Sequence, residues 1–134
     1  MEKTEIMGLI SAAMAVRKNS YAPYSAFYVG AALMAEDGTV FTGTNCENAS
    51  YPAGHCAERA AFAAAVSAGK RRFRAIAVAG GKEDIPDGYC MSCGICRQMM
   101  SELCSGDFII ILAKGKSEYK LYTLDEMLPL QFTL

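Results

Sequence analysis

The feature that most constrains this chain is a set of three cysteines and one glutamate at spacings typical of a metal site. Cys56 and Glu58 are two positions apart, and Cys93 and Cys96 form a Cys-x2-Cys pair further along the chain. Such a pair lets two sulfur atoms reach one zinc ion, with Zn–S distances of about 2.3 Å. Three thiols leave the fourth tetrahedral position open for water, which zinc makes acidic enough to ionise near neutral pH. The set therefore predicts a hydrolytic zinc site in which Glu58 moves protons and does not bind the metal.

Two other interpretations of these cysteines stay open at this point. The Cys-x2-Cys pair alone could be a redox pair, although this leaves Cys56 and Glu58 without a role. Cys90 and Cys93 form a second, overlapping Cys-x2-Cys pair, so Cys90 could complete a closed structural site of four cysteines. A closed site would bind no water. We expect the open site, because overlapping pairs are awkward to arrange around one ion.

Several neighbouring residues have less specific signals. Arg59 follows Cys56 by three positions on the same helical face, so we expect it to donate to the thiolate and reduce the negative charge at the metal. His55 precedes Glu58 by three positions, and we expect it in a loop or outside the ligand set. Cys46 and Cys104 are predicted to be small core residues.

The hydrophobic pattern predicts helices interleaved with strands. An Asp-Gly pair within residues 36–39 is typical of a hairpin turn, and Gly69 is typical of the position after a helix end. This order predicts an α/β fold and a single domain over residues 1–134. Helices are expected over 4–17, 56–68 and 93–104 and, capped by Thr123, before Pro129; strands are expected over 27–34, 40–46, 74–79, 107–113 and 119–122.

Composition excludes some classes of function. The net charge is −1, from 13 basic and 14 acidic residues, whereas proteins that grip a nucleic acid polymer usually have a basic excess. We interpret the basic run at 70–74 as a solvated loop. The first 18 residues do not resemble a secretory signal, no apolar stretch is long enough to span a membrane, and six cysteines favour a reducing compartment, so we expect the cytoplasm.

Several segments resemble the cytidine deaminases that act on free nucleosides, specifically those with three cysteine ligands. The resemblance covers essentially the whole chain, in the expected order: residues 21–33 (YAPYSAFYVGAAL), 45–51 (NCENASY), 56–59 (CAER), 93–98 (CGICRQ) and 124–132 (LDEMLPLQF). It implies a three-layer α/β/α sandwich with a mixed sheet of about five strands and helices on both faces. It also implies hydrolytic deamination of cytidine and 2′-deoxycytidine in pyrimidine salvage, with Glu58 protonating N3 of the base.

The resemblance implies roles for residues outside the metal site. It implies that Phe27 packs against the base, that the backbone of Ala57 contacts the base, and that Tyr51 borders the same pocket. Asn45 and Glu47 are implied to hydrogen-bond the ribose. Their spacing of two in an extended segment separately predicts that they project to the same side.

The resemblance also implies one zinc ion per chain and a homotetramer with shared active sites, in which Phe132 reaches into a neighbouring subunit. The high apolar fraction, 52%, agrees with a subunit interface. The chain departs from the family at Ser92, where a proline is usual, and at Cys90 and Met91. Three rival functions are deamination of a modified or antibiotic nucleoside, a non-catalytic zinc protein, and editing of a polynucleotide.

Overall fold

A computed structural model describes residues 1–134, in which five strands form one mixed sheet with the order β2-β1-β3-β4-β5. Strands β3 and β4 run parallel, and every other neighbouring pair is antiparallel. The strands are β1 (Tyr28–Ala35), β2 (Val40–Thr44), β3 (Phe73–Gly81), β4 (Ile109–Ala113) and β5 (Tyr119–Thr123). The helices are α1 (Lys3–Val16), α2 (Ala57–Ser67), α3 (Gly94–Leu103) and α4 (Leu124–Met127), with single 3-10 turns at Arg17–Asn19 and Tyr51–Ala53.

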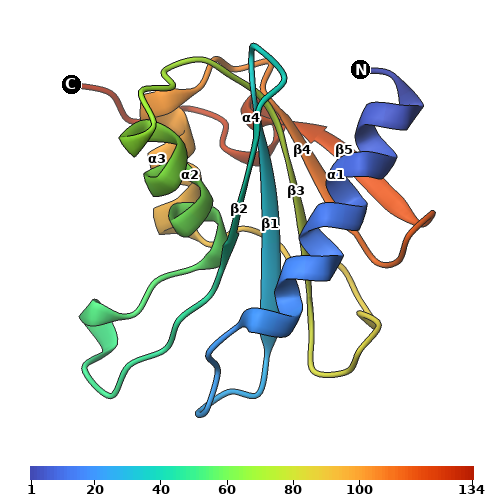
Figure 1. Cartoon of the computed structure of the whole chain (residues 1–134). Coiled ribbons are helices and arrows are strands. Elements are labelled where there is room, and N and C mark those ends of the chain that lie inside the picture. Colours follow the sequence, from blue (N-terminus) through green and yellow to red (C-terminus); the bar gives the residue numbers. More distant parts are fainter.

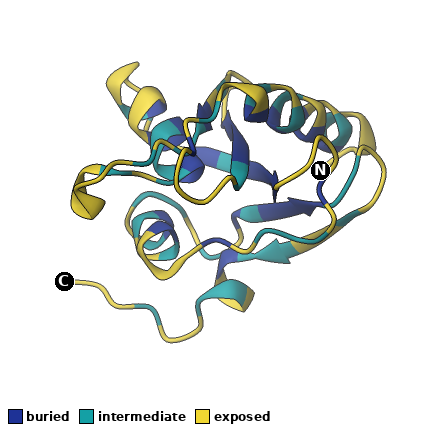
Figure 2. Ribbon diagram, turned by 90° about the horizontal axis from the view of Figure 1, so that it is seen from below, coloured by how far each residue is buried: buried dark blue, intermediate teal, exposed yellow.

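Helix α1 covers one face of the sheet, and α2 and α3 lie on the other (Figure 1). Strand β1 serves both layers because its side chains alternate: Ala32 and Met34 pack with α1, whereas Ala31 and Leu33 pack with α2. Buried residues concentrate in the central strands and on the inward sides of the helices (Figure 2). The predicted three-layer α/β/α sandwich and the mixed five-stranded sheet are confirmed.

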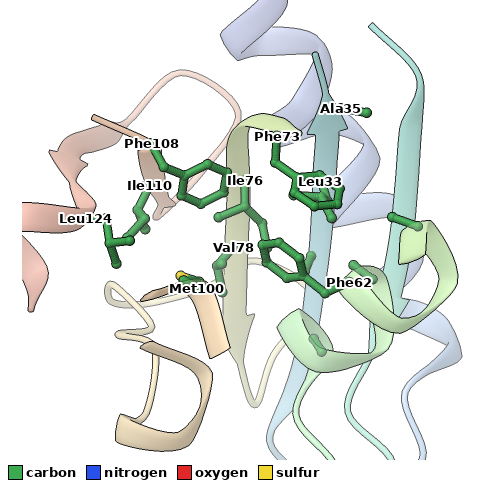
Figure 3. Packing of buried hydrophobic residues seen from close by; sticks show 14 of the residues in the cluster. Leu33, Ala35, Phe62, Phe73, Ile76, Val78, Met100, Phe108, Ile110 and Leu124 are labelled. Atoms are coloured by element: carbon green, nitrogen blue, oxygen red, sulfur yellow. The ribbon is translucent and has the colours of Figure 1, made fainter. Parts of the chain in front are cut away.

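The two layers of core differ in the size of their side chains. Figure 3 shows aromatic packing between the sheet and α2, where the ring of Phe62 lies edge-on to that of Phe73, with 5.1 Å between centroids. The layer under α1 is lined on β3 by alanines, so that helix lies close to the strands. At Gly30 a Cβ atom would lie 2.0 Å from the carbonyl oxygen of Ala13, so only glycine allows α1 this approach.

Helix α2 is held close to the sheet in the same way. At Gly43 of β2, a Cβ atom would lie 2.5 Å from the backbone nitrogen of Ala61 and 2.6 Å from the carbonyl oxygen of Ala57. The absence of a side chain at this position therefore sets the depth of α2. This matters for the site, because Cys56 and Glu58 are located at the start of α2.

The helix ends follow the sequence signals closely. Gly69 adopts φ +89° and, with Lys70, donates to the last carbonyls of α2, which is the Schellman arrangement. Thr123 and Glu126 form the reciprocal capping box of α4. Cys56 and Cys93, predicted to lie in the first turns of their helices, occupy the N-cap positions of α2 and α3 instead.

Two minor predictions are wrong in part or whole. Cys46 is exposed and not a core residue, because it follows the end of β2, beyond the packed region of the sheet. The basic run is a loop only up to Arg72, since Phe73 is buried at the start of β3 and Arg74 pairs with Glu5 at 3.0 Å.

None of the helices has the length and apolar character that crossing a membrane requires.

Candidate active site

Three thiols meet where the N-termini of α2 and α3 lie side by side. The Sγ atom of Cys93 lies 3.7 Å from that of Cys56 and 3.5 Å from that of Cys96, and all three atoms lie within 4.8 Å of one another. Sulfur ligands at the corners of a zinc tetrahedron are about 3.8 Å apart for Zn–S bonds of about 2.3 Å. The three thiols therefore fit one zinc ion. Cys90 is not among the thiols gathered at this point, so the closed four-cysteine arrangement does not form.

Hydrogen bonding favours the thiolate form at Cys56. A hydrogen bond from Cys96 and a second from Arg59, whose Nη2 lies 3.9 Å from the sulfur, lower the pKa of the Cys56 thiol to about 5 against the opposing effect of burial. The same contact with Cys56, together with burial, raises the pKa of the Cys96 thiol. Arg59 therefore supplies positive charge next to a ligand sulfur, as predicted from its spacing.

Glu58 lies in the first turn of α2 and is 3% exposed. Burial raises the pKa of its carboxyl group, because an apolar environment disfavours the charged form. The hydroxyl of Ser92 opposes this rise, and the negative charge of Cys56 adds to it. A buried carboxyl with a raised pKa, next to a metal site, is suited to exchanging protons.

Cys56, Cys93 and Glu58 border a cleft of about 690 Å³, whereas Cys96 is buried and does not line it. The cleft lies at the end of the sheet where β1 begins and β2 ends, and its lining comes from four separate parts of the chain. Five of the residues expected to contact substrate line the cleft: Phe27, Asn45, Glu47, Tyr51 and Ala57. They lie beside two of the three thiols, Cys56 and Cys93, and beside Glu58 and Arg59.

Comparison with known proteins decides the family. Residues 3–112 match the family model of the cytidine and deoxycytidylate deaminase zinc-binding region. The chain belongs to this deaminase family. It is 42% identical over 129 residues to the cytidine deaminase of Sporosarcina psychrophila, covering 96% of this chain and 92% of that protein. It is 45% identical over 126 residues to the cytidine deaminase of Halalkalibacterium halodurans, covering 93% and 92%.

The fold agrees with a solved structure of the same family. The crystal structure of cytidine deaminase from Burkholderia pseudomallei superposes with a TM-score of 0.86 at 42% identity, and the match covers 98% of this chain and all of that one. The family match is to a zinc-binding region, and the three thiols have the spacing that zinc requires. Zinc is therefore the cofactor of this deaminase site, as the cysteine spacing predicts.

Asn45 and Glu47 both line the cleft, and both are held by residues that precede or begin β1. Asn45 accepts a hydrogen bond from the backbone nitrogen of Val29 at 2.9 Å and donates to the carbonyl oxygen of Phe27 at 2.8 Å. Glu47 accepts from the backbone nitrogens of Tyr24 and Ser25 and from the Ser25 hydroxyl. These contacts fix both side chains at the cleft of the deaminase site.

Phe132 does not line the cleft of its own chain. Its side chain is 66% exposed, and its carbonyl oxygen accepts a hydrogen bond from Gln98 of α3 at 3.1 Å. A further hydrogen bond joins Ser101 of α3 to Gln131. The C-terminal segment is thus attached to α3 through polar contacts, while the Phe132 ring is free to meet another molecule.

The sequence analysis missed several residues that line the cleft. Tyr24 and Ser25 contribute through the segment that precedes β1, and Cys90 and Met91 contribute from the connection after β3. Cys90 fits because Gly80 has no side chain: a Cβ atom there would lie 2.9 Å from the Cys90 sulfur. No periodic signal marks Cys90, since it lies in an irregular segment, but the resemblance already covers Tyr24 and Ser25.

Proposed function

We propose that residues 1–134 form a single zinc-dependent deaminase domain that hydrolyses cytidine and 2′-deoxycytidine to uridine and 2′-deoxyuridine with release of ammonia. The observation that carries this proposal is a buried Glu58 that lines a cleft of about 690 Å³ together with Cys56 and Cys93, two of three thiols that supply only three of zinc's four ligands. A structural zinc site has four protein ligands and no open position, so it would have no use for a buried carboxyl beside the metal. The relatives from S. psychrophila and H. halodurans, both named cytidine deaminases, support this substrate class.

The chemistry needs a nucleophile, a proton carrier and a leaving group. When bound, zinc would supply the Lewis acid that makes water nucleophilic near neutral pH. We assign to Glu58 the transfer of the proton from the attacking water to N3 of the base, and later of a proton to the departing amine. The water oxygen forms a bond to C4, and the bond from C4 to the exocyclic nitrogen breaks, so ammonia leaves. The burial of Glu58 limits proton exchange with bulk water during these transfers.

We assign the substrate contacts to the residues that line the cleft. Phe27 packs against the base, and the backbone of Ala57 contacts the base next to Glu58. Asn45 and Glu47 hydrogen-bond the ribose, and Tyr51 borders the pocket. The polar anchoring of Asn45 and Glu47 supports this, because a side chain fixed before binding loses less entropy when it binds a diol.

We propose that the enzyme acts as a homotetramer in the cytoplasm, as part of pyrimidine salvage. In the assembly, Phe132 would complete the cleft of a neighbouring subunit. The exposed apolar side chains of Leu130, Phe132 and Leu134 near the tail support an interface there. All six cysteines are free, which favours a reducing compartment.

An ultraviolet assay of substrate turnover by the zinc-loaded protein tests the function. The panel comprises cytidine, 2′-deoxycytidine, a cytosine nucleoside antibiotic, cytosine itself and a cytosine-containing oligonucleotide. We expect turnover of the first two and a decrease of about 10²–10⁴ in kcat for Glu58→Gln, with zinc retained at one ion per chain. Faster turnover of the antibiotic than of cytidine would contradict the substrate assignment. A loss of less than about tenfold for Glu58→Gln would mean that another group transfers the protons.

A further inference from the structure

Arg17 is the only buried basic side chain of the protein, with 4% of its surface exposed. It follows α1 in the 3-10 turn and does not line the active-site cleft. Its guanidinium group forms no ion pair with a carboxylate. Instead it donates four hydrogen bonds to backbone carbonyl oxygens. This buried charge therefore holds main chain in place.

The four acceptors belong to two parts of the chain that meet only in the folded protein. The Nε atom donates to the carbonyl oxygen of Tyr28 at 2.8 Å, and Nη2 donates to that of Gly81 at 2.9 Å. Tyr28 and Gly81 face each other as the terminal pair of the ladder between β1 and β3. Nη2 also donates to the carbonyl oxygen of Glu83 at 2.8 Å, and Nη1 to that of Asp84 at 2.9 Å. The guanidinium group thus ties the start of β1 to the first residues after β3.

Both of these parts lead directly into walls of the cleft. Phe27 immediately precedes β1, and Cys90 is carried by the irregular segment 82–92, which the guanidinium group holds at its start. The two walls meet at Gly80, where a Cβ atom would lie 2.9 Å from the Cys90 sulfur and 3.0 Å from Cε2 of the Phe27 ring. Carbonyl groups in an irregular segment have no ladder to pair with, so the position of the segment depends on donors such as this one.

We propose that Arg17 is a positioning residue that fixes the Phe27 wall and the Cys90 wall of the cleft relative to each other. This rests on the proposed function, which places the base of the substrate against Phe27. Without the guanidinium group, the segment after β3 is free to move away from the start of β1. Glu58 on α2 makes no hydrogen bond with Arg17, so the loss should weaken substrate binding more than it slows the chemical step.

Steady-state kinetics of three zinc-loaded variants with cytidine test the proposal. Arg17→Met removes every donor, whereas Arg17→Lys keeps the charge but loses the planar fork that reaches several carbonyl oxygens at once. The control is Ile10→Ala, which deletes a buried side chain of α1 that packs on the sheet, and so lowers stability without touching the hydrogen bonds of Arg17. Each protein is assayed at the same interval below its own unfolding midpoint. We expect KM to rise about tenfold for Arg17→Met and about threefold for Arg17→Lys, with kcat within about twofold in both and KM unchanged for Ile10→Ala.

Two kinetic results would overturn the proposal. One is an unchanged KM in both Arg17 variants. The other is an equal rise in KM for Arg17→Met and Ile10→Ala, which would assign the effect to lost stability alone. If Arg17→Met does not fold, the comparison of Arg17→Lys with Ile10→Ala decides in the same way.

Hydrogen exchange of the backbone amides measures the same contacts without turnover. We expect the amides of residues 27–29 and 82–91 to exchange at least about tenfold faster in Arg17→Met than in the parent, and no such local change in Ile10→Ala. Faster exchange spread evenly over the chain in both variants would show that Arg17 does not hold these two segments. If the parent turns over no cytidine, the proposed function fails, and the exchange pattern still decides whether Arg17 fixes the two walls.

Discussion

Replacing Gly43 by alanine should impair catalysis from a position that does not line the cleft. The added Cβ atom would lie 2.5 Å from the backbone nitrogen of Ala61, 2.6 Å from the carbonyl oxygen of Ala57 and 2.8 Å from the Cβ atom of Ala60. Two of these atoms belong to the backbone of α2 and cannot rotate away. Helix α2 must therefore move from β2 by about 0.9 Å, the difference between 2.5 Å and the 3.4 Å at which ordinary contact begins.

This movement has two expected costs. Overpacking against backbone should lower the free energy of unfolding by about 2–3 kcal/mol. For a chain of 134 residues, this corresponds to a decrease in unfolding midpoint of roughly 7–11 °C. Glu58 and Cys56 move with the helix, and a misplacement of about 1 Å at a reacting group can reduce the rate by about 10²-fold. We therefore expect kcat/KM for cytidine to fall by about that factor, to be measured with the midpoint by calorimetry and the ultraviolet assay.

The matched control is Gly8→Ala, which makes the same chemical change in α1, where a Cβ atom meets nothing within 4 Å. Glycine inside a helix is less stable than alanine by about 0.5–1 kcal/mol, so this variant should be slightly more stable than the parent and equally active. A Gly43→Ala protein with the parent's midpoint and kcat/KM would refute the reasoning that close packing on β2 positions the active site.

Three further predictions concern the metal, the tail and the buried arginine. Cys56→Ala, Cys93→Ala and Cys96→Ala should each lose zinc in elemental analysis and lose stability, because metal binding and folding are coupled, whereas Cys90→Ala should keep one zinc ion per chain; equal loss from Cys90→Ala would contradict the three-thiol site. Phe132→Ala should raise KM for cytidine more than it lowers zinc content, and light scattering of the parent should give about four times the chain mass; a fully active monomer would refute the shared site. Arg17→Met should lower the free energy of unfolding by at least about 3 kcal/mol in a denaturant titration, because four carbonyl oxygens lose their donor. An unchanged midpoint for Arg17→Met would show that these oxygens find other partners.

Local features of this protein could be predicted from the sequence because they depend on residues a few positions apart. Gly69 ends α2 with φ +89°, and Gly38 turns the β1–β2 hairpin with φ +91°, as expected where a left-handed conformation is needed. The capping box at Thr123 and the reach of Cys93 and Cys96 to one ion follow from short spacings as well. The order of helices and strands predicted an α/β fold, and the family resemblance implied the three-layer arrangement.

Other features depend on contacts between distant parts of the chain, and only the tertiary structure decides them. Cys56 reaches Cys93 because α2 and α3 pack on the same face of the sheet with their N-termini side by side. Cysteine is usually a buried residue type, but Cys46 is exposed outside the packed sheet. Phe132 does not line the cleft of its own chain. The burial of Ser92 without a hydrogen-bond partner for its hydroxyl is of the same kind. Spacing and periodicity specify which face of an element is apolar, but the depth and neighbours of a side chain result from how those faces pack together.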